Sequence, residues 1–255
     1  MKTQLNELIT NFEKIGVCKG DVLFVHSSLS ALGWVDGGSE TVIDALLCAI
    51  GTQGTLLMPA FSYATTTLYP YCFSMEKSVC CVGTIPEYFR CRENTMRSEN
   101  PTHSISGCGL RVKEILSSHS MDTTPVGKHS PLSLLTKCKG KILFLGCGLN
   151  SNTMMHGVEE EAGVPYVLKH QPVEYTIETS DMQMKKLMYY QHNFDGYKQC
   201  YNRLEQIISP KFIRKGKVLE ADSILLDAEE AWRIAFEKMK KDPFYFVENI
   251  NNCSN

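Results

Sequence analysis

Two short apolar runs with a helical segment between them lie near the N-terminus. The first run is 21–26 and the second is 55–59, and both have the length and composition of buried strands. Between them, apolar residues recur at helical spacing over 39–49, with Ser39 as the expected N-cap and Gly51 as the expected end. A strand, a helix and a second strand in this order form a βαβ unit, which builds mostly parallel sheets with helices on both faces. The sequence therefore predicts an α/β fold.

The remaining apolar patterns extend this α/β prediction along the chain. A further buried strand is predicted at 141–146, and alternating residues at 173–177 and 186–190 are typical of a hairpin. Helical spacing of apolar residues predicts helices over six further segments: 5–14, 85–92, 110–117, 131–135, 201–208 and 227–240. Residues 62–81 show no sustained period, so we expect a long surface loop there. No repeat or linker marks a boundary, and we expect a single domain over residues 1–255.

Charge and hydropathy exclude several classes of protein. Lysine and arginine total 26 against 28 aspartate and glutamate, so the net charge of -2 does not favour nucleic acid as a partner. No apolar run approaches the ~20 residues of a membrane-spanning helix, and the first residues lack the apolar core of a signal peptide. We therefore expect a cytoplasmic protein that binds neither nucleic acid nor a membrane.

The chain contains 11 cysteines, which is a high and odd number for its length. None forms a CxxC pair, which argues against a zinc ribbon or a thioredoxin-like redox site. We expect free, buried thiols that pack as small hydrophobic groups, and no metal site. One group remains open as a set of metal ligands: Cys72, Cys80, Cys81 and Cys91.

A histidine and a glutamate three residues apart follow the predicted strand at 141–146. If a helix begins near Thr153, His156 and Glu159 share one face, so the carboxylate can orient the imidazole. A histidine held by a carboxylate is suited to general-base catalysis. The alternative is a surface helix in which 159–161 is a solvated acidic run and the histidine has no catalytic role. Spacing alone leaves both interpretations open.

A loop rich in serine and glycine follows the first predicted strand. The segment 26–33, with two more glycines beyond it, presents backbone N–H groups before a helix, as phosphate-binding loops do. It matches neither GxGxxG nor the phosphate loop that ends in Lys-Ser/Thr, and its serines lack the G-x-S-x-G elbow of a hydrolase. A plain turn with capping serines is the alternative interpretation.

Two further polar stretches are candidates for ligand contacts. In 97–104, Pro101 breaks regular structure and His103 follows it. In 127–132, Ser130 is expected to cap the short helix that begins at the next residue. Capping alone would explain the second stretch.

Six ordered segments together resemble the aminoglycoside 3-N-acetyltransferase family. They are HSSLSALGWVDGG at 26–38, GTLLMPAF at 54–61, VGTIPEYFR at 82–90, RSENPTHS at 97–104, GKHSPLSLL at 127–135 and NTMMHGVE at 152–159. The resemblance extends from about residue 20 to 162 and continues more faintly to 235. It implies a single α/β domain unrelated to the GNAT acetyltransferase fold. It also implies acetyl-coenzyme A as the cosubstrate and an amine of an aminoglycoside as the acetyl acceptor.

The resemblance further implies roles for individual residues. His156 would act as the general base, oriented by Glu159. Coenzyme A would lie against the loop after the first strand, with two weaker candidates farther along the chain: His26, Ser27, Ser28, Leu29, Ser30 and Gly33, then Arg97 and Ser130. Substrate contacts are expected from four residues: Asn100, His103, His192 and Asp195. No metal is expected, and a homodimer is left open.

The sequence departs from the family pattern within RSENPTHS. The family usually has RSxHPxxS, so Asn100 stands where a histidine is expected, and His103 is the only imidazole of the segment. This departure leaves the substrate open. For a polycationic substrate, the acidic run 159–161, Asp36 and Glu87 are expected to attract positive charge.

Three other functions compete with aminoglycoside acetylation. The nearest is acetylation of another amine, such as a nucleotide-linked amino sugar of surface polysaccharide biosynthesis. A second is a binding protein that keeps the fold without catalysis, although the pair of His156 and Glu159 argues against it. The third is a metal-dependent hydrolase that uses the seven histidines, and no HExxH or HxxxH spacing supports it.

Overall fold

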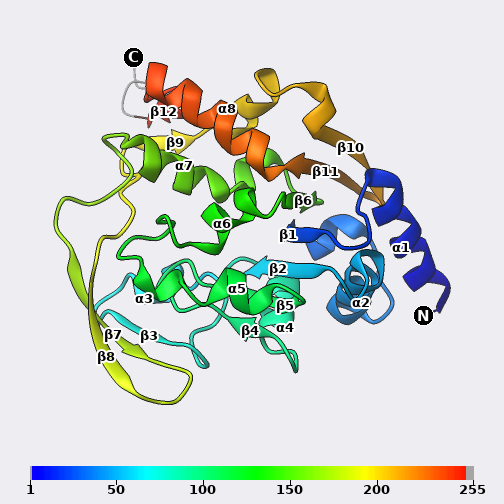
Figure 1. The fold of residues 1–255 in the computed structure, drawn as a ribbon, viewed down its shortest axis with the longest axis horizontal. Coiled ribbons are helices and arrows are strands. Elements are labelled where there is room, and N and C mark those ends of the chain that lie inside the picture. The colour runs from blue at the N-terminus through cyan, green and yellow to red at the C-terminus, as the bar shows by residue number, and fades with distance from the viewer. Residues whose placement is uncertain (1, 251–255) are drawn as a thin grey trace.

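The computed structural model describes residues 2–250, and its centre is a seven-stranded β-sheet (Figure 1). Three parallel strands form the middle of this sheet: β6 (Lys141–Leu145), β1 (Val22–Ser27) and β2 (Thr55–Pro59). The outer strands pair antiparallel and are β4 (Met96–Arg97), β5 (Ile105–Gly109), β10 (Ile213–Val218) and β11 (Ala221–Asp227). The spatial order is β10, β11, β6, β1, β2, β5, β4. The predicted α/β fold is confirmed, but the sheet is parallel only at its centre, where two of its six strand pairings lie, and the other four pairings are antiparallel.

Continuous apolar sequence explains why β1, β2 and β6 lie in the middle of the sheet. Side chains alternate across a strand, so Phe24 of β1 packs in one core while Leu23 and Val25 pack in the core on the other face. Every residue of β2 is buried. The edge strand β10, in contrast, exposes four of its six residues.

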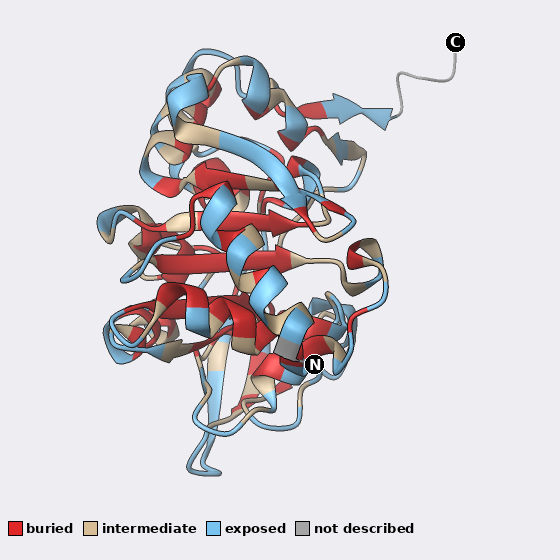
Figure 2. Cartoon of the chain, turned by 90° about the vertical axis from the view of Figure 1, so that its right-hand side faces the viewer, coloured by how far each residue is buried: buried red, intermediate tan, exposed pale blue. Residues whose placement is uncertain are grey.

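Helices cover both faces of the sheet (Figure 1). One face is covered by α1 (Lys2–Ile15), α2 (Gly38–Ile50) and α4 (Thr84–Arg90). The other is covered by α5 (Val112–Leu116), α6 (Pro131–Lys137), α7 (Met154–Ala162) and α8 (Ala228–Lys241). Figure 2 shows the result: the central strands are buried, whereas the outward faces of the helices are exposed. Both faces of the sheet are therefore covered by helices.

Two smaller sheets complete the fold. The hairpin predicted at 173–177 and 186–190 is confirmed as β7 (Val173–Glu178) and β8 (Met184–Tyr189). A third strand, β3 (Cys72–Ser74), pairs parallel with β7, and β9 (Tyr197–Gln199) pairs with β12 (Val247–Asn249). The prediction that 62–81 is a long loop without regular structure is wrong, because this segment contains both β3 and the short helix α3 (Tyr63–Thr66). The strand was missed because its partner is remote in sequence.

The predicted helices are confirmed except at 201–208. That segment begins with a 3₁₀ helix, Tyr201–Gln206, and four other short 3₁₀ helices are Leu29–Leu32, His119–Met121, Leu149–Ser151 and Pro210–Phe212. The predicted N-cap of α2 is also wrong. Ser39 lies inside the helix, and Gly37 is the N-cap with a φ of 81°, a value that favours glycine. The predicted end at Gly51 is confirmed.

Most cysteines lie nearer the surface than the sequence indicated. The ten described cysteines are free thiols, and Cys253 lies outside the described residues. Only Cys80 and Cys200 are buried, so the prediction of buried thiols is wrong for the other eight. Among residues 2–250, no helix has the length and apolar character that crossing a bilayer requires.

Candidate functional site

A cavity of about 550 Å³ opens at the carboxyl ends of the three parallel strands. His26 and Ser27 of β1 line it, together with Pro59 at the end of β2 and Cys147 just beyond β6. In α/β folds the carboxyl edge of the parallel strands is where ligands bind, because the chain diverges there into loops. The fold thus places the predicted site segments around one cavity.

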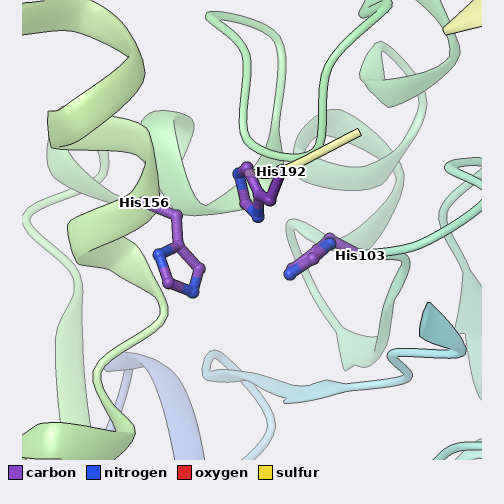
Figure 3. A group of neighbouring side chains, drawn as sticks. All are labelled: His103, His156 and His192. Atoms are coloured by element: carbon purple, nitrogen blue, oxygen red, sulfur yellow. The ribbon is translucent and has the colours of Figure 1, made fainter. Parts of the chain in front are cut away.

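Three histidine rings meet inside this cavity (Figure 3). His103 comes from the segment before β5, His156 from α7 and His192 from the loop after β8. The ring centroid of His192 lies 4.9 Å from that of His103 and 4.8 Å from that of His156, and the latter two are 5.8 Å apart. The sequence indicated each residue separately, and the structure brings them together.

His156 is held by a buried carboxylate on its own helix. Its Nδ1 lies 3.2 Å from Oε2 of Glu159, which is completely buried. The hydroxyl of Tyr201 donates to the same carboxylate oxygen at 2.8 Å, and that of Tyr166 donates to the other oxygen at 3.1 Å. With Nδ1 facing a carboxylate, the neutral ring carries its proton there and leaves Nε2 as a proton acceptor. The alternative of an exposed Glu159 is therefore wrong.

The other two glutamates of the acidic run also have partners within the protein. Glu160 accepts a hydrogen bond from the backbone N–H of Val126 at 2.8 Å and lies 3.0 Å from Nε2 of His192. Burial raises the pKa of Glu160 to about 7. Glu161 accepts from the indole N–H of Trp232. None of the three lines the cavity, so the predicted attraction of a polycation by this run is not supported by their positions.

Burial keeps the other cavity histidines neutral near pH 7. It lowers the pKa of His26 to about 3, with a further contribution from the neighbouring His156. Burial also lowers the pKa values of His103 and His192 well below the ordinary value, again assisted by neighbouring histidines. These three side chains therefore line the cavity as uncharged imidazoles.

The loop predicted to bind coenzyme A forms a separate groove beside the cavity. This groove has a volume of about 660 Å³ and shares Ser27 with the cavity. The remaining residues that line it are Ser28, Leu29, Ser30, Gly33, Trp34, Val35, Gly37, Gly38, Gly83 and Thr84. His26 lines the cavity rather than the groove. The two hollows thus lie on either side of Ser27 at the end of β1.

Two of the predicted cofactor residues line neither hollow. The guanidinium of Arg97 donates to the backbone carbonyls of Ala60, Met75 and Ser78, and burial lowers its pKa to about 10. Ser130 is fully buried and caps α6 by accepting from the backbone N–H two residues on. Both side chains hold the backbone of the site segments in place.

Asn100 also acts within the protein rather than in the cavity. Its Oδ1 accepts from the hydroxyl of Tyr189 at 2.9 Å and from the backbone N–H groups of Thr102 and His103. Its amide donates to the carbonyl of Thr124. The side chain is 1% exposed and does not line the cavity. Asn100 was predicted to contact the substrate, but in the structure it holds the turn that carries His103. Asp195, another predicted substrate contact, does line the cavity.

Several residues of the site carried no signal in the sequence. Tyr201 and Tyr166 hold Glu159, although Tyr201 lies 45 residues from His156 in the chain. Tyr63 and Thr67, which lie in the segment expected to be a long surface loop, also line the cavity. Pairs so distant in sequence produce no periodic pattern that could reveal them.

Comparison with known proteins assigns the family. A family model described as aminoglycoside 3-N-acetyltransferase matches residues 24–240. This chain belongs to that family. The membership predicted from the six sequence segments is confirmed.

Curated relatives and solved structures agree with this membership. Aminoglycoside N(3)-acetyltransferase VIII of Streptomyces fradiae is 32% identical over 186 residues, which are 65% of this chain and 65% of that protein. The corresponding enzyme IX of Micromonospora chalcea is 28% identical over 87% of this chain and 88% of its own length. The crystal structure of the AAC(3)-IVa apoenzyme has a TM-score of 0.81 and 26% identity, over 98% of this chain and 93% of that one.

Two other solved structures contain bound ligands. A histidine-to-alanine mutant of AAC(3)-IVa in complex with a gentamicin has a TM-score of 0.81 and 27% identity, over 94% of this chain and 90% of that one. AAC-IIIb bound to CoASH has a TM-score of 0.81 and 24% identity, over 93% of this chain and 96% of that one, and it has the same fold as this chain. The fold class of this family is the one that the sequence predicted.

Proposed function

We propose that residues 1–255 form one catalytic domain that transfers an acetyl group from acetyl-coenzyme A to an amine of an aminoglycoside, at the 3-N position by family membership. The observation that carries this proposal is His156, which lines a cavity and is held by the buried carboxylate of Glu159. This cavity shares Ser27 with the neighbouring groove. Relatives named as aminoglycoside N(3)-acetyltransferases support the substrate class. The AAC-IIIb complex with CoASH supports coenzyme A as the donor.

His156 supplies the proton acceptor that acetyl transfer requires. An ammonium group has no lone pair, so the amine reacts in its neutral form after losing one proton to solvent. Nε2 of His156 then removes a second proton as the amine nitrogen attacks the thioester carbonyl. The new N–C bond forms a tetrahedral intermediate, and the C–S bond then breaks to release coenzyme A. The imidazolium returns its proton to the leaving sulfur, which completes the proton balance. Glu159 orients the ring and stabilises its positive charge between these steps.

Coenzyme A fits the groove formed by the loop after β1 and the start of α2. Gly37, the N-cap of α2, has no side chain to accept hydrogen bonds from the first turn, so the N–H groups there are suited to phosphate. Ser28 and Ser30 add hydroxyl groups along the groove. Because Ser27 lines both hollows, the thioester arm can pass it and reach His156 in the cavity.

The charges of the cavity favour a second candidate substrate, a nucleotide-linked amino sugar. Asp195 is the only carboxylate among the described residues that line the cavity, and the cation Lys169 lines it as well. Glu87, which was expected to attract a polycation, is paired with Arg90. A single carboxylate gives weak attraction for a substrate with several ammonium groups, whereas Lys169 can pair with a phosphate.

Turnover of a substrate panel tests the proposal. Acetylated products are measured by mass spectrometry with acetyl-coenzyme A and a set of aminoglycosides and nucleotide-linked amino sugars, for the unmodified chain and for His156→Ala. We expect turnover of an aminoglycoside that falls by about 10²–10⁴-fold in this variant, the usual contribution of a general base. His170→Ala, at an exposed histidine outside the cavity, is the matched control.

Each outcome of this experiment has a definite meaning. Turnover of amino sugars alone assigns the second candidate substrate. Equal turnover by the unmodified chain and His156→Ala removes the general-base role. Absence of both turnover and acetyl-coenzyme A binding rejects the acetyltransferase proposal.

A further inference from the structure

The three histidines of the cavity have the spacing of a metal site. One ring nitrogen of each of His103, His156 and His192 lies within 4.8 Å of one ring nitrogen of both others. Among residues 2–250, this is the one group of histidine, cysteine and carboxylate side chains with that spacing. Figure 3 shows the rings arranged around a common space.

An oxygen atom outside the cluster already engages one nitrogen of every ring. The three contacts are His103 Nδ1 to Thr102 Oγ1 at 2.9 Å, His156 Nδ1 to Glu159 Oε2 at 3.2 Å, and His192 Nε2 to Glu160 Oε1 at 3.0 Å. Histidines that bind metals in proteins have this arrangement, in which the second nitrogen donates to an oxygen and fixes the tautomer. The remaining nitrogens are Nε2 of His103, Nε2 of His156 and Nδ1 of His192, which then carry free lone pairs.

We propose that His103, His156 and His192 bind one Zn²⁺ ion when no amine is present, and that the bound ion inhibits acetyl transfer. Zinc accepts three imidazole nitrogens and one water in tetrahedral geometry. Magnesium and calcium prefer oxygen ligands, which this cluster does not supply. The donor set therefore selects zinc over the two divalent cations that are common in cells.

The spacing requires only small side-chain movements. A point equidistant from three nitrogens 4.8 Å apart lies ~2.8 Å from each, and a Zn–N bond is about 2.0–2.1 Å long. Each ring therefore moves inward by less than about 1 Å, while its outer hydrogen bond acts as a hinge. The cavity of about 550 Å³ leaves room for the water that completes the coordination.

The inhibition rests on the proposed function, because it requires His156 to act as the base. Nε2 of His156 is the atom that takes the amine proton, and a bound metal ion occupies the same lone pair. Zinc and a productively bound amine therefore exclude each other. Acetyl transfer itself uses no metal, so removing the ion should activate the enzyme rather than disable it.

Cobalt binding tests the site without any activity measurement. Chelator-treated protein is titrated with Co²⁺, whose visible ligand-field bands report four-coordinate binding. Cysteine thiolates would add a sulfur-to-cobalt charge-transfer band in the near ultraviolet. We expect one Co²⁺ per chain, no thiolate band, and displacement by Zn²⁺.

Variants assign the binding to the cluster. His103→Ala and His192→Ala should each weaken Co²⁺ binding at least tenfold, whereas the exposed His170→Ala should leave it unchanged. His192→Gln keeps an amide that can donate to Glu160, so it guards against a loss caused by misfolding. Retained binding in these cluster variants, or a thiolate band, would overturn the site.

Inhibition is measured by the loss of thioester absorbance, because Zn²⁺ also binds the free thiol of coenzyme A. We expect Zn²⁺ to inhibit competitively with the amine, and a chelator to restore full turnover. Turnover that is unaffected at Zn²⁺ concentrations saturating the site would overturn the inhibitory role. If Co²⁺ binds as expected but no amine is acetylated, the proposed function fails while the metal site stands.

Discussion

Replacement of Glu159 by glutamine is expected to lower kcat by about 10³-fold. Glu159 is fully buried, and its Oε2 lies 3.2 Å from Nδ1 of His156. At that distance and an effective dielectric constant of ~20, a carboxylate and an imidazolium attract each other by about 5 kcal/mol. Since about 1.4 kcal/mol corresponds to a tenfold change in rate, the loss of most of this attraction gives the expected decrease.

The glutamine amide would also disturb the proton on His156. If its NH₂ group takes the place of Oε2, it donates to Nδ1, and the proton of the imidazole moves to Nε2. A protonated Nε2 cannot accept a proton from the amine. The same NH₂ group would face the hydroxyl of Tyr201, which now donates to Oε2. Both effects act in the same direction as the loss of charge.

Steady-state kinetics measure the effect of Glu159→Gln. The KM for acetyl-coenzyme A should stay unchanged, because Glu159 does not line the groove. The substitution should therefore lower kcat alone. Glu161→Gln is the matched control, since this glutamate lies on the same helix and binds Trp232 instead of a histidine. A variant that remains folded by circular dichroism and loses less than tenfold in kcat would refute the electrostatic role of Glu159.

Three further predictions concern other residues. Asp195→Asn should raise the KM of a cationic amine about fivefold, or ~1 kcal/mol for one exposed charge, with little change in kcat; an unchanged KM would place the ammonium groups elsewhere. Burial lowers the pKa of His119 to about 3. Between about pH 6.5 and 3, His119 therefore binds a proton in the unfolded protein but not in the folded one. The free energy of unfolding should fall with decreasing pH in that window, and His119→Gln should reduce this slope by about 1.4 kcal/mol per pH unit in denaturant titrations; equal slopes would contradict the burial effect. Gly33→Ala should destabilise the fold by about 1–2 kcal/mol, because φ is +76° and the added Cβ meets the Glu220 carboxyl group at 2.5 Å; an unchanged melting temperature would disprove the strain.

The core of the fold was predictable because its signals are local. The strands at 21–26, 55–59 and 141–146 are short apolar runs between polar turns, and burial on both faces requires no knowledge of their partners. The strand at 72–74 was missed because it depends on pairing with β7, about a hundred residues away. The pair of strands at 213–227 was missed as well, since exposed charges obscure the alternation of β10.

The candidate site, like the fold, has features that local sequence patterns indicated and features that they did not. The contact of His156 with Glu159 was one of two interpretations that their i, i+3 spacing left open, and the burial of Glu159 in the folded chain decides between them. The sequence could not predict that His103 and His192 lie beside His156, because the three residues come from separate segments that only the folded chain brings together. The expectation of no metal site relied on the spacing of ligands in the sequence, and this spacing does not reveal histidines that come together from distant segments.

Asn100 shows how a departure from the family pattern can act without touching the substrate. Its Oδ1 accepts hydrogen bonds from the hydroxyl groups of Tyr189 and Thr102 and from two backbone N–H groups of the turn that carries His103. A neutral histidine has one acceptor nitrogen, so the histidine expected at this position could not hold the turn in the same way. Because Tyr189 belongs to β8, Asn100 also ties the small sheet to the segment of His103. The departure therefore bears on the placement of His103, which lines the cavity, and not on a direct contact of Asn100 with the cavity.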